Sequence, residues 1–455
     1  MLVPSVVLLV VVLAAVLAWQ AGALNRYICD GACGLSTVVA PEGLVSLPVG
    51  GAAAVSTPDA GPLDAASVQA AVEGALDDPD LGGHVGFVAL DAATGEHVVS
   101  RGADALIPAS TAKLLTGFAA LTHIDPQSRF VTKVVREGDR LVLVGGGDPY
   151  LVRELPERRS YAVRADLETL ADRTAAALAA TSTTSVGLDW DASLFEGPAV
   201  SPAWEPGYVP SGVVSPVSAL WVDEGRLDGG GRSTDPARDA TSAFADALEQ
   251  RGIDVAGDSS SVDVSPSAQE LARVTGATVA QAVEALVMSS DNDAAEVMLR
   301  HAAIGASQPA TFDGGVTATL EALDDAGVPV DGLQLHDGSG LSRHNRVSAA
   351  TLARLLLASD AEPRAAGLLD DLPVAGFSGS LADRFASSTE AFGLARAKTG
   401  TLTGVHGLAG VVTDAGGRPV VFALLADRTE AVTPAATQAA LDRVVAAVAS
   451  CACGA

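Results

Sequence analysis

Lysine is scarce in this 455-residue chain. Only three of its 28 basic residues are lysines, Lys113, Lys133 and Lys398, and arginine supplies the positive charge everywhere else. Arginine keeps its proton inside proteins, whereas the pKa of a lysine can be lowered until the amine acts as a base. A lysine that stands in a short motif of this chain therefore invites a chemical explanation.

Positive charge is also scarce overall, because 28 lysine and arginine residues face 55 aspartate and glutamate residues, for a formal net charge of −27. A phosphate backbone repels such an anionic protein, so the balance argues against nucleic-acid binding. The seven histidines include no His-Glu-x-x-His motif and no close spacing with a cysteine. We therefore expect neither a catalytic metal nor any other cofactor.

Charged side chains are absent from residues 2–19, a run of 18 residues. That length fits either the core of a signal peptide or a membrane-spanning helix. Ala21-Gly22-Ala23 is a plausible cleavage site, although no lysine or arginine precedes the run as in an ordinary signal peptide. We expect residues 1–23 to be a signal peptide or membrane anchor, and the remainder to be exported to the extracytoplasmic cell envelope, secreted or membrane-anchored.

Cysteine occurs only four times, as Cys29, Cys33, Cys451 and Cys453. In an exported protein these four suggest two disulfides with three possible connectivities, and a zinc site is the alternative. Bridges between the first pair and the second would fasten residues 24–64 to the C-terminal helix. Those residues are rich in Gly, Ala, Pro and Val without a helical or strand period, and we expect a flexible linker there.

The stretch 108–113 reads Pro-Ala-Ser-Thr-Ala-Lys and places Ser110 and Lys113 one turn apart on the same face of a helix. A serine hydroxyl becomes a nucleophile when a neighbour removes its proton, and an amine can do so only if its pKa falls below the usual value of about 10.4. Burial or a second cation would lower it. Alone, Ser-x-x-Lys also fits a capped helix start with a surface lysine.

Two further motifs follow in order, Ser290-Asp291-Asn292 and Lys398-Thr399-Gly400. The first contains one of only three asparagines in the chain, and the second contains one of the three lysines. Each triplet alone also fits a helix cap or a turn. The ordered set Ser-x-x-Lys, Ser-x-Asn and Lys-Thr-Gly is a catalytic signature of β-lactamases and penicillin-binding proteins.

With these motifs and their flanks, the chain resembles the low-molecular-mass class C penicillin-binding proteins, the D-alanyl-D-alanine carboxypeptidase and endopeptidase family of bacterial cell walls. The resemblance covers roughly residues 65–450 and includes the stretches 145–149, 191–195 with Trp204, 215–220 and 337–343. It is specific because the order, the spacing and the flanks of the motifs all agree.

The resemblance implies an α+β fold of the serine β-lactamase and penicillin-binding transpeptidase type, in which an antiparallel sheet flanked by helices meets a helical cluster, with an inserted α/β domain. We expect the catalytic domain at 65–126 and 269–450, the insertion at 127–268 and a cysteine-containing tail at 451–455. Alternating and helical periods predict helices at 65–76, 167–180, 240–251 and 434–449 and strands at 85–91, 97–100, 130–135, 140–144, 185–190, 406–413 and 420–425.

The expected chemistry is acylation of Ser110. Ser110 attacks the carbonyl of the penultimate D-Ala in a peptidoglycan stem peptide that ends in D-Ala-D-Ala, and Lys113 takes its proton. Ser290 relays a proton to the leaving amine and helps to hold Lys113. β-Lactams would acylate the same serine as covalent inhibitors. The identity of the base is disputed for this constellation, and we favour Lys113.

Four residues are expected to bind the substrate: Asn292, Lys398, Thr399 and Thr401. The asparagine offers its amide to the substrate backbone, and the lysine and threonines meet the terminal carboxylate. Lys398 would also hold Lys113 below its free pKa. By resemblance, the backbone N–H groups of Ser110 and Thr401 form the oxyanion hole. Gly400 would let its strand pass close to the substrate.

Two other functions stay open. A serine β-lactamase would share all three motifs, but no Glu-x-x-x-Asn sequence lies between Asn292 and Lys398, and the large insertion fits poorly. A non-catalytic penicillin-binding or wall-binding protein would keep the fold without turnover. The sequence does not separate carboxypeptidase from endopeptidase action, since both reactions use the same serine.

Overall fold

The computed structural model describes residues 61–102, 104–157 and 161–454. The expected signal peptide or anchor, most of the expected linker, and Cys29 and Cys33 lie outside these described residues. Within the described ranges, no helix combines the length and the apolar character that crossing a bilayer requires.

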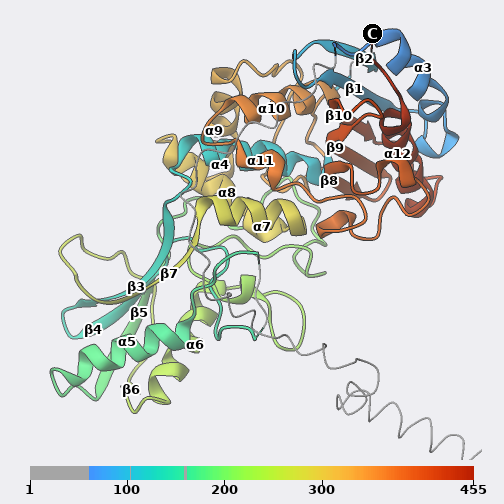
Figure 1. Cartoon of the computed structure of the whole chain (residues 1–455). Helices are drawn as coiled ribbons and strands as arrows, with labels where there is room; N and C mark the ends of the chain where they lie inside the picture. Colours follow the sequence, from blue (N-terminus) through green and yellow to red (C-terminus); the bar gives the residue numbers. More distant parts are fainter. Residues whose placement is uncertain (1–60, 103, 158–160, 455) are drawn as a thin grey trace, which may run out of the picture. The chain divides into compact units, whose positions relative to one another are not determined.

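The two ends of the described chain build one antiparallel sheet of five strands (Figure 1). On β10, Val421 and Ala423 join the core on the side of the helical cluster, and Val420 and Phe422 join the core on the opposite face, because successive side chains point to opposite faces. Both faces of the sheet are therefore buried. The strand order is β2-β1-β10-β9-β8, with β1 at Val85–Asp91, β2 at His97–Arg101, β8 at Ala395–Leu402, β9 at Val405–Thr413 and β10 at Pro419–Ala426.

Helices cover both faces of this sheet (Figure 1). Helices α3 (Ala65–Leu76) and α12 (Pro434–Ser450) share the core of one face, and α10 (Ala349–Ala361) packs on the other. Each begins at a side chain that accepts a hydrogen bond from the backbone N–H three residues further on: Asp64, Thr433 and Ser348. The expected α+β fold is confirmed.

A helical cluster lies beside the sheet and contains the segment that follows Ser110. Its central helix, α4 (Lys113–His123), is buried along nearly its whole length, with Leu114, Leu115 and Phe118 in the shared core. A helix packed on all sides holds its first residues firmly in place. The helices around it are α7 (Val279–Ser289), α8 (Asn292–Gly305), α9 (Phe312–Asp325), α10 and α11 (Gly367–Asp370).

The insertion between α4 and α7 forms a second, mixed sheet with its own apolar core (Figure 1). We expected this insertion to end at residue 268, but strand β7 pairs antiparallel with β3, so the second sheet continues to Thr278. The strand order is β6-β5-β4-β3-β7, with β3 at Arg129–Glu137, β4 at Arg140–Val144, β5 at Ser185–Asp191, β6 at Asp254–Val255 and β7 at Gln269–Thr278, and the helices are α5 (Leu167–Ala179) and α6 (Pro236–Glu249).

A long connection, residues 192–235, joins β5 to α6 and packs against the helical cluster. Its Trp204 and Trp221 share a small apolar core with Val297 of α8 and Phe312 of α9. This packing brings the insertion to the start of α8, where the Ser-x-Asn motif lies.

The C-terminal cysteines form a disulfide with each other, Cys451 to Cys453, with 5.0 Å between their Cα atoms. A bridge from either of them to the N-terminal pair, which we considered, is therefore not what the structure shows. Backbone hydrogen bonding fastens the tail instead, because Asp64 N–H donates to the carbonyl oxygen of Cys453 at 2.8 Å and Leu63 pairs with Gly454.

Candidate active site

Ser110 lies in a short 3₁₀ helix, Ala109–Ala112, that leads directly into α4. Ala109 has a φ of 46°, a left-handed conformation that costs a non-glycine residue about 1–3 kcal/mol and that is often found next to catalytic groups. A Cβ on Gly400 of β8 would lie 2.6 Å from the Pro108 carbonyl oxygen. We expected Gly400 to make room for substrate, and in the structure it makes room for the turn that carries the nucleophile.

Lys113 is fully buried, and its amine has three hydrogen-bonding partners. Its Nζ lies 2.9 Å from Ser110 Oγ, 2.8 Å from Asn292 Oδ1 and 2.7 Å from the Ser339 carbonyl oxygen. A neutral amine has two hydrogens and one lone pair, whereas the two carbonyl oxygens can only accept. In the neutral form of Lys113 they take both hydrogens, so its lone pair faces the Ser110 hydroxyl. This is the arrangement that proton removal from the serine requires.

The electrostatic surroundings keep this amine easy to deprotonate. Burial lowers the pKa of Lys113 to about 8, and the nearby carboxyls of Glu296, Asp291 and Asp337 oppose that shift. We expected Lys398 to be the cause, but burial is the dominant one. Burial also lowers the pKa of Lys398 well below its ordinary value, and the charge of Lys113 lowers it further.

Lys398 and Ser290 form a second pair at the end of α7. Lys398 Nζ donates to Ser290 Oγ and to the Thr399 carbonyl oxygen, both at 2.8 Å. Ser290 ends α7 in a left-handed conformation, with φ at 59°. It contacts Lys398 rather than Lys113, so the expectation that Ser290 helps to hold Lys113 is wrong in this structure. Asn292 and the Ser339 carbonyl take that position.

The other two expected residues lie on β8. The Thr399 hydroxyl is 2.8 Å from the hydroxyl of Ser380, and Thr401 is exposed. Asn292 uses both ends of its amide inside the protein, because Oδ1 accepts from Lys113 and Nδ2 donates to the Val213 carbonyl oxygen at 3.0 Å. One hydrogen on Nδ2 is left for a substrate carbonyl, so the predicted contact with the substrate backbone stays a prediction.

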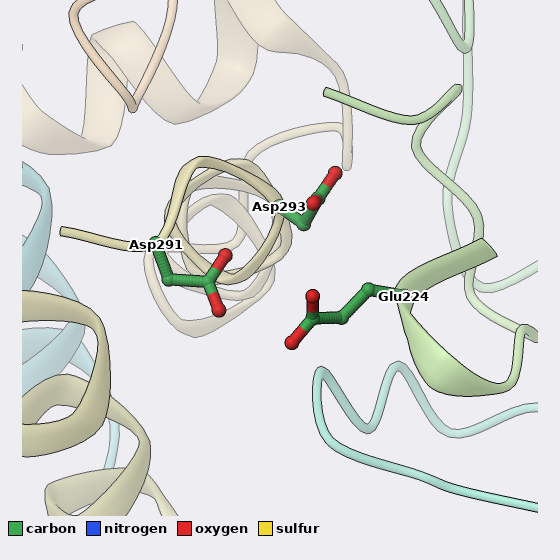
Figure 2. Close-up of side chains that lie close together, drawn as sticks. All are labelled: Glu224, Asp291 and Asp293. Carbon is green, nitrogen blue, oxygen red and sulfur yellow. The ribbon is translucent and has the colours of Figure 1, made fainter. Parts of the chain in front are cut away.

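Three carboxyl groups, those of Glu224, Asp291 and Asp293, gather beside the Ser-x-Asn motif (Figure 2). Oxygen atoms from all three lie within 4.8 Å of one another. Arg232 donates to Asp293 at 2.5 Å and Arg226 donates to Glu224 at 2.7 Å. Two of the three carboxylates thus have guanidinium partners, and we assign no metal to the cluster.

The third carboxyl of this cluster, that of Asp291, caps the N-terminus of α8. Burial, followed by repulsion from Glu224 and Asp293, raises the pKa of Asp291 to about 8. The carboxyl therefore keeps its proton at neutral pH. A cavity of about 480 Å³ adjoins the cluster and reaches Ser290 and Asn292, so the cluster and the Ser-x-Asn motif face one space.

Three contributors to the site were not expected from the sequence: the carbonyl of Ser339, the hydroxyl of Ser380 and the carbonyl of Val213. The stretch 337–343 was noted only as part of the resemblance, and a backbone carbonyl leaves no signal in a sequence because every residue has one. Ser380 lies in no recognisable motif. The contact of Val213 joins residues 79 positions apart.

A buried lysine beside a serine, faced by a second lysine and serine on this α+β fold, defines an active-site serine enzyme of the class that includes penicillin-binding proteins. The chain belongs to the D-Ala-D-Ala carboxypeptidase 3 (S13) family, whose model matches residues 68–230 and 228–448. It is a serine-type D-Ala-D-Ala carboxypeptidase. The resemblance read from the motifs is confirmed.

Two relatives named as carboxypeptidases match most of the chain. A carboxypeptidase of Mycobacterium tuberculosis is 37% identical over 379 residues, which are 80% of this chain and 80% of the relative. The carboxypeptidase DacB of Mycolicibacterium smegmatis is 35% identical over 404 residues, 85% of this chain and 84% of the relative. The crystal structure of penicillin binding protein 4 (dacB) from Haemophilus influenzae shares the fold, with a TM-score of 0.68 at 21% identity over 84% of this chain and 98% of that one.

Proposed function

We propose that the protein removes the terminal D-Ala from peptidoglycan stem peptides ending in D-Ala-D-Ala, through an acyl-enzyme on Ser110. The observation that carries this proposal is the geometry of Lys113, whose Nζ lies 2.9 Å from Ser110 Oγ and contacts two carbonyl oxygens that can accept both hydrogens of the neutral amine. A serine held beside a buried amine with a lowered pKa is an activated nucleophile.

Acylation follows from these contacts. Ser110 Oγ bonds to the carbonyl carbon of the penultimate D-Ala as its proton moves to Lys113. The bond from that carbon to the nitrogen of the terminal D-Ala then breaks, and the departing amine takes a proton from the Lys398 ammonium through the Ser290 hydroxyl. The proton that Lys113 took from Ser110 passes to Lys398 in turn, so Lys113 is neutral again before water attacks. Water hydrolyses the ester in the second half of the reaction, with Lys113 as the base that accepts its proton.

The substrate carboxylate is assigned to Lys398, Thr399 and Thr401. Because burial disfavours the charge on Lys398, a bound carboxylate would restore the ammonium form and so favour pairing with a free C-terminus. The backbone N–H groups of Ser110 and Thr401 are proposed as the oxyanion hole, in which one donor is typically worth about 3 kcal/mol.

Inhibition by β-lactams and action in the cell envelope belong to the same proposal. The Haemophilus influenzae penicillin binding protein 4 has been solved in complex with a β-lactam, which supports β-lactam binding to this chain. The substrate is outside the cytoplasm, so export by residues 1–23, or membrane attachment through them if they are retained, would bring the enzyme to it. Cleavage of cross-links is a second outcome that the same serine allows.

The test is mass spectrometry after incubation with benzylpenicillin, with Ser110→Ala as the matched control. A single penicilloyl adduct that maps to Ser110 and is absent from the variant is the expected result. Release of D-Ala from a D-Ala-D-Ala peptide then separates an enzyme from a non-catalytic penicillin-binding protein, and fast loss of the adduct would instead indicate a β-lactamase. No adduct and no release would overturn the proposal.

A further inference from the structure

Glu296 is a fully buried glutamate that the mechanism above does not use. It lies on α8 four residues after Asn292, so the two side chains share one face of the helix. Its carboxylate accepts two backbone hydrogen bonds, from Ser339 N–H at 2.8 Å and from Gly338 N–H at 2.9 Å. An acidic side chain in a core is costly unless such partners compensate it.

The backbone that Glu296 holds is the one that contacts the base. The carbonyl oxygen of Ser339 accepts from Lys113 Nζ at 2.7 Å, and the carbonyl oxygen of Gly338 accepts from the Thr116 hydroxyl at 2.7 Å. The loop is also packed tightly, since a Cβ on Gly338 would lie 2.8 Å from the Ala295 carbonyl oxygen. Two residues on one face of α8 therefore act on the Lys113 amine. Asn292 contacts it directly, and Glu296 acts indirectly by binding the backbone of Ser339.

We propose that Glu296 is a positioning residue for Lys113: it fixes the Gly338–Ser339 backbone so that the Ser339 carbonyl takes one hydrogen of the amine. This inference rests on the proposed function, in which Lys113 is the base that activates Ser110.

Loss of the carboxylate has two consequences for the amine. In Glu296→Gln one of the two buried N–H groups would face the amide NH2 in place of an acceptor, and the loop would turn to relieve this contact, which takes the Ser339 carbonyl away from Lys113. The amine would then keep Asn292 as its remaining fixed acceptor, and its lone pair would no longer be directed at Ser110 Oγ. A displacement of about 1 Å in such a group can cost roughly 100-fold in rate.

The second consequence is electrostatic. Burial lowers the pKa of Lys113, and Glu296 opposes that shift more than the other carboxyls do. Replacing Glu296 by a neutral residue is therefore expected to lower the pKa of Lys113 further. The carboxyl itself has a pKa raised to about 8 by burial and then by the charge of Asp337, so it supplies its negative charge only in the upper part of the pH range in which Lys113 loses its proton. The charged or titratable groups around this pair are Asp291, Asp293, Asp337, Arg300 and Lys398.

The experiment measures the acylation rate constant with a fluorescent penicillin from about pH 6 to about pH 10, a range that brackets the titration of the base. The variants are Glu296→Gln, which removes the charge, and Glu296→Asp, which keeps the charge on a shorter arm. Glu73→Gln, an exposed glutamate of α3, is the matched control. Circular dichroism measures the folded fraction of each protein.

Acylation rises with pH as Lys113 loses its proton, so the midpoint of that rise reports the pKa of the base. We expect Glu296→Gln to slow acylation roughly 100-fold and to move the midpoint down by about one pH unit. Glu296→Asp is expected to slow acylation without moving the midpoint. The position of the midpoint does not depend on how much of the variant is folded, so a purely structural defect would leave it unchanged.

An unchanged midpoint in Glu296→Gln, with a rate equal to the parent after correction for the folded fraction, would overturn the inference. If Glu296→Gln does not fold, Glu296→Asp decides, because a parental rate there would show that the placement of the carboxylate is unimportant. Failure of the parent itself to become acylated would refute the proposed function instead, so the two failures are distinguishable.

Discussion

Replacement of Lys113 by alanine tests the central assignment. The change removes the amine 2.9 Å from Ser110 Oγ and leaves the serine without a base. General-base catalysis contributes roughly 100-fold to 10,000-fold to a rate, so acylation by a fluorescent penicillin should fall by that factor. Asn292 Oδ1 and the Ser339 carbonyl lose a donor, which costs about 1–3 kcal/mol of unfolding free energy for each buried unsatisfied group. Removal of a buried ammonium partly offsets that cost.

The chain offers a matched control, because Lys133 is half-buried on β3 of the insertion and outside the three motifs. Lys133→Ala should acylate at the parental rate. Ser290→Ala should only slow acylation, since Ser290 contacts Lys398 and acts on the leaving group. Equal acylation by Lys113→Ala and the parent, with urea unfolding showing both folded, would refute the assignment of Lys113 as the base.

Three further predictions concern the surroundings of the site. Burial raises the pKa of Asp291 from 3.8 to about 8, so the folded protein keeps a proton that the unfolded chain loses. The free energy of unfolding should therefore fall as pH rises from about 4 to about 8. Asp291→Asn should show a smaller fall in urea unfolding, and equal pH dependence of the unfolding free energy in parent and variant would contradict this reasoning. Arg232→Met leaves Asp293 buried without its 2.5 Å partner and should cost about 3–5 kcal/mol, whereas Arg238→Met, in an exposed pair, should cost about 1 kcal/mol or less. Gly400→Ala brings a Cβ to 2.6 Å from the Pro108 carbonyl oxygen and should slow acylation, and a parental rate would show that the turn before Ser110 can move freely.

Much of the catalytic centre could be predicted from the sequence because its chemistry lies in short local patterns. The spacing of Ser110 and Lys113 fixes their common helix face, and the scarcity of lysine and asparagine makes Lys398 and Asn292 stand out. The strands near both ends follow from their apolar runs, and the observed bounds of β1 are those expected, Val85–Asp91.

The remainder depends on long-range packing that no local pattern records. The Ser339 carbonyl is a backbone group, and Glu296 looks like any acidic residue on a helix until burial and its partners are known. The pairing of β7 with β3 joins segments about 140 residues apart along the chain, so the insertion boundary was placed ten residues too early. Likewise, the position of the C-terminal cysteines depends on backbone pairing of the tail with residues 63 and 64, which no local pattern predicts.

The insertion also has a consequence for any attempt to exchange domains between relatives. Its connection from β5 to α6 supplies the Val213 carbonyl that holds Asn292, and the Arg232 and Glu224 side chains that surround the start of α8. A chimaera that takes the two sheets from one parent and the connection from β5 to α6 from another would therefore break the contacts of the Ser-x-Asn motif. The unit that can be transplanted is the connection 192–235 together with α8, so these two segments are expected to change together when the family diversifies.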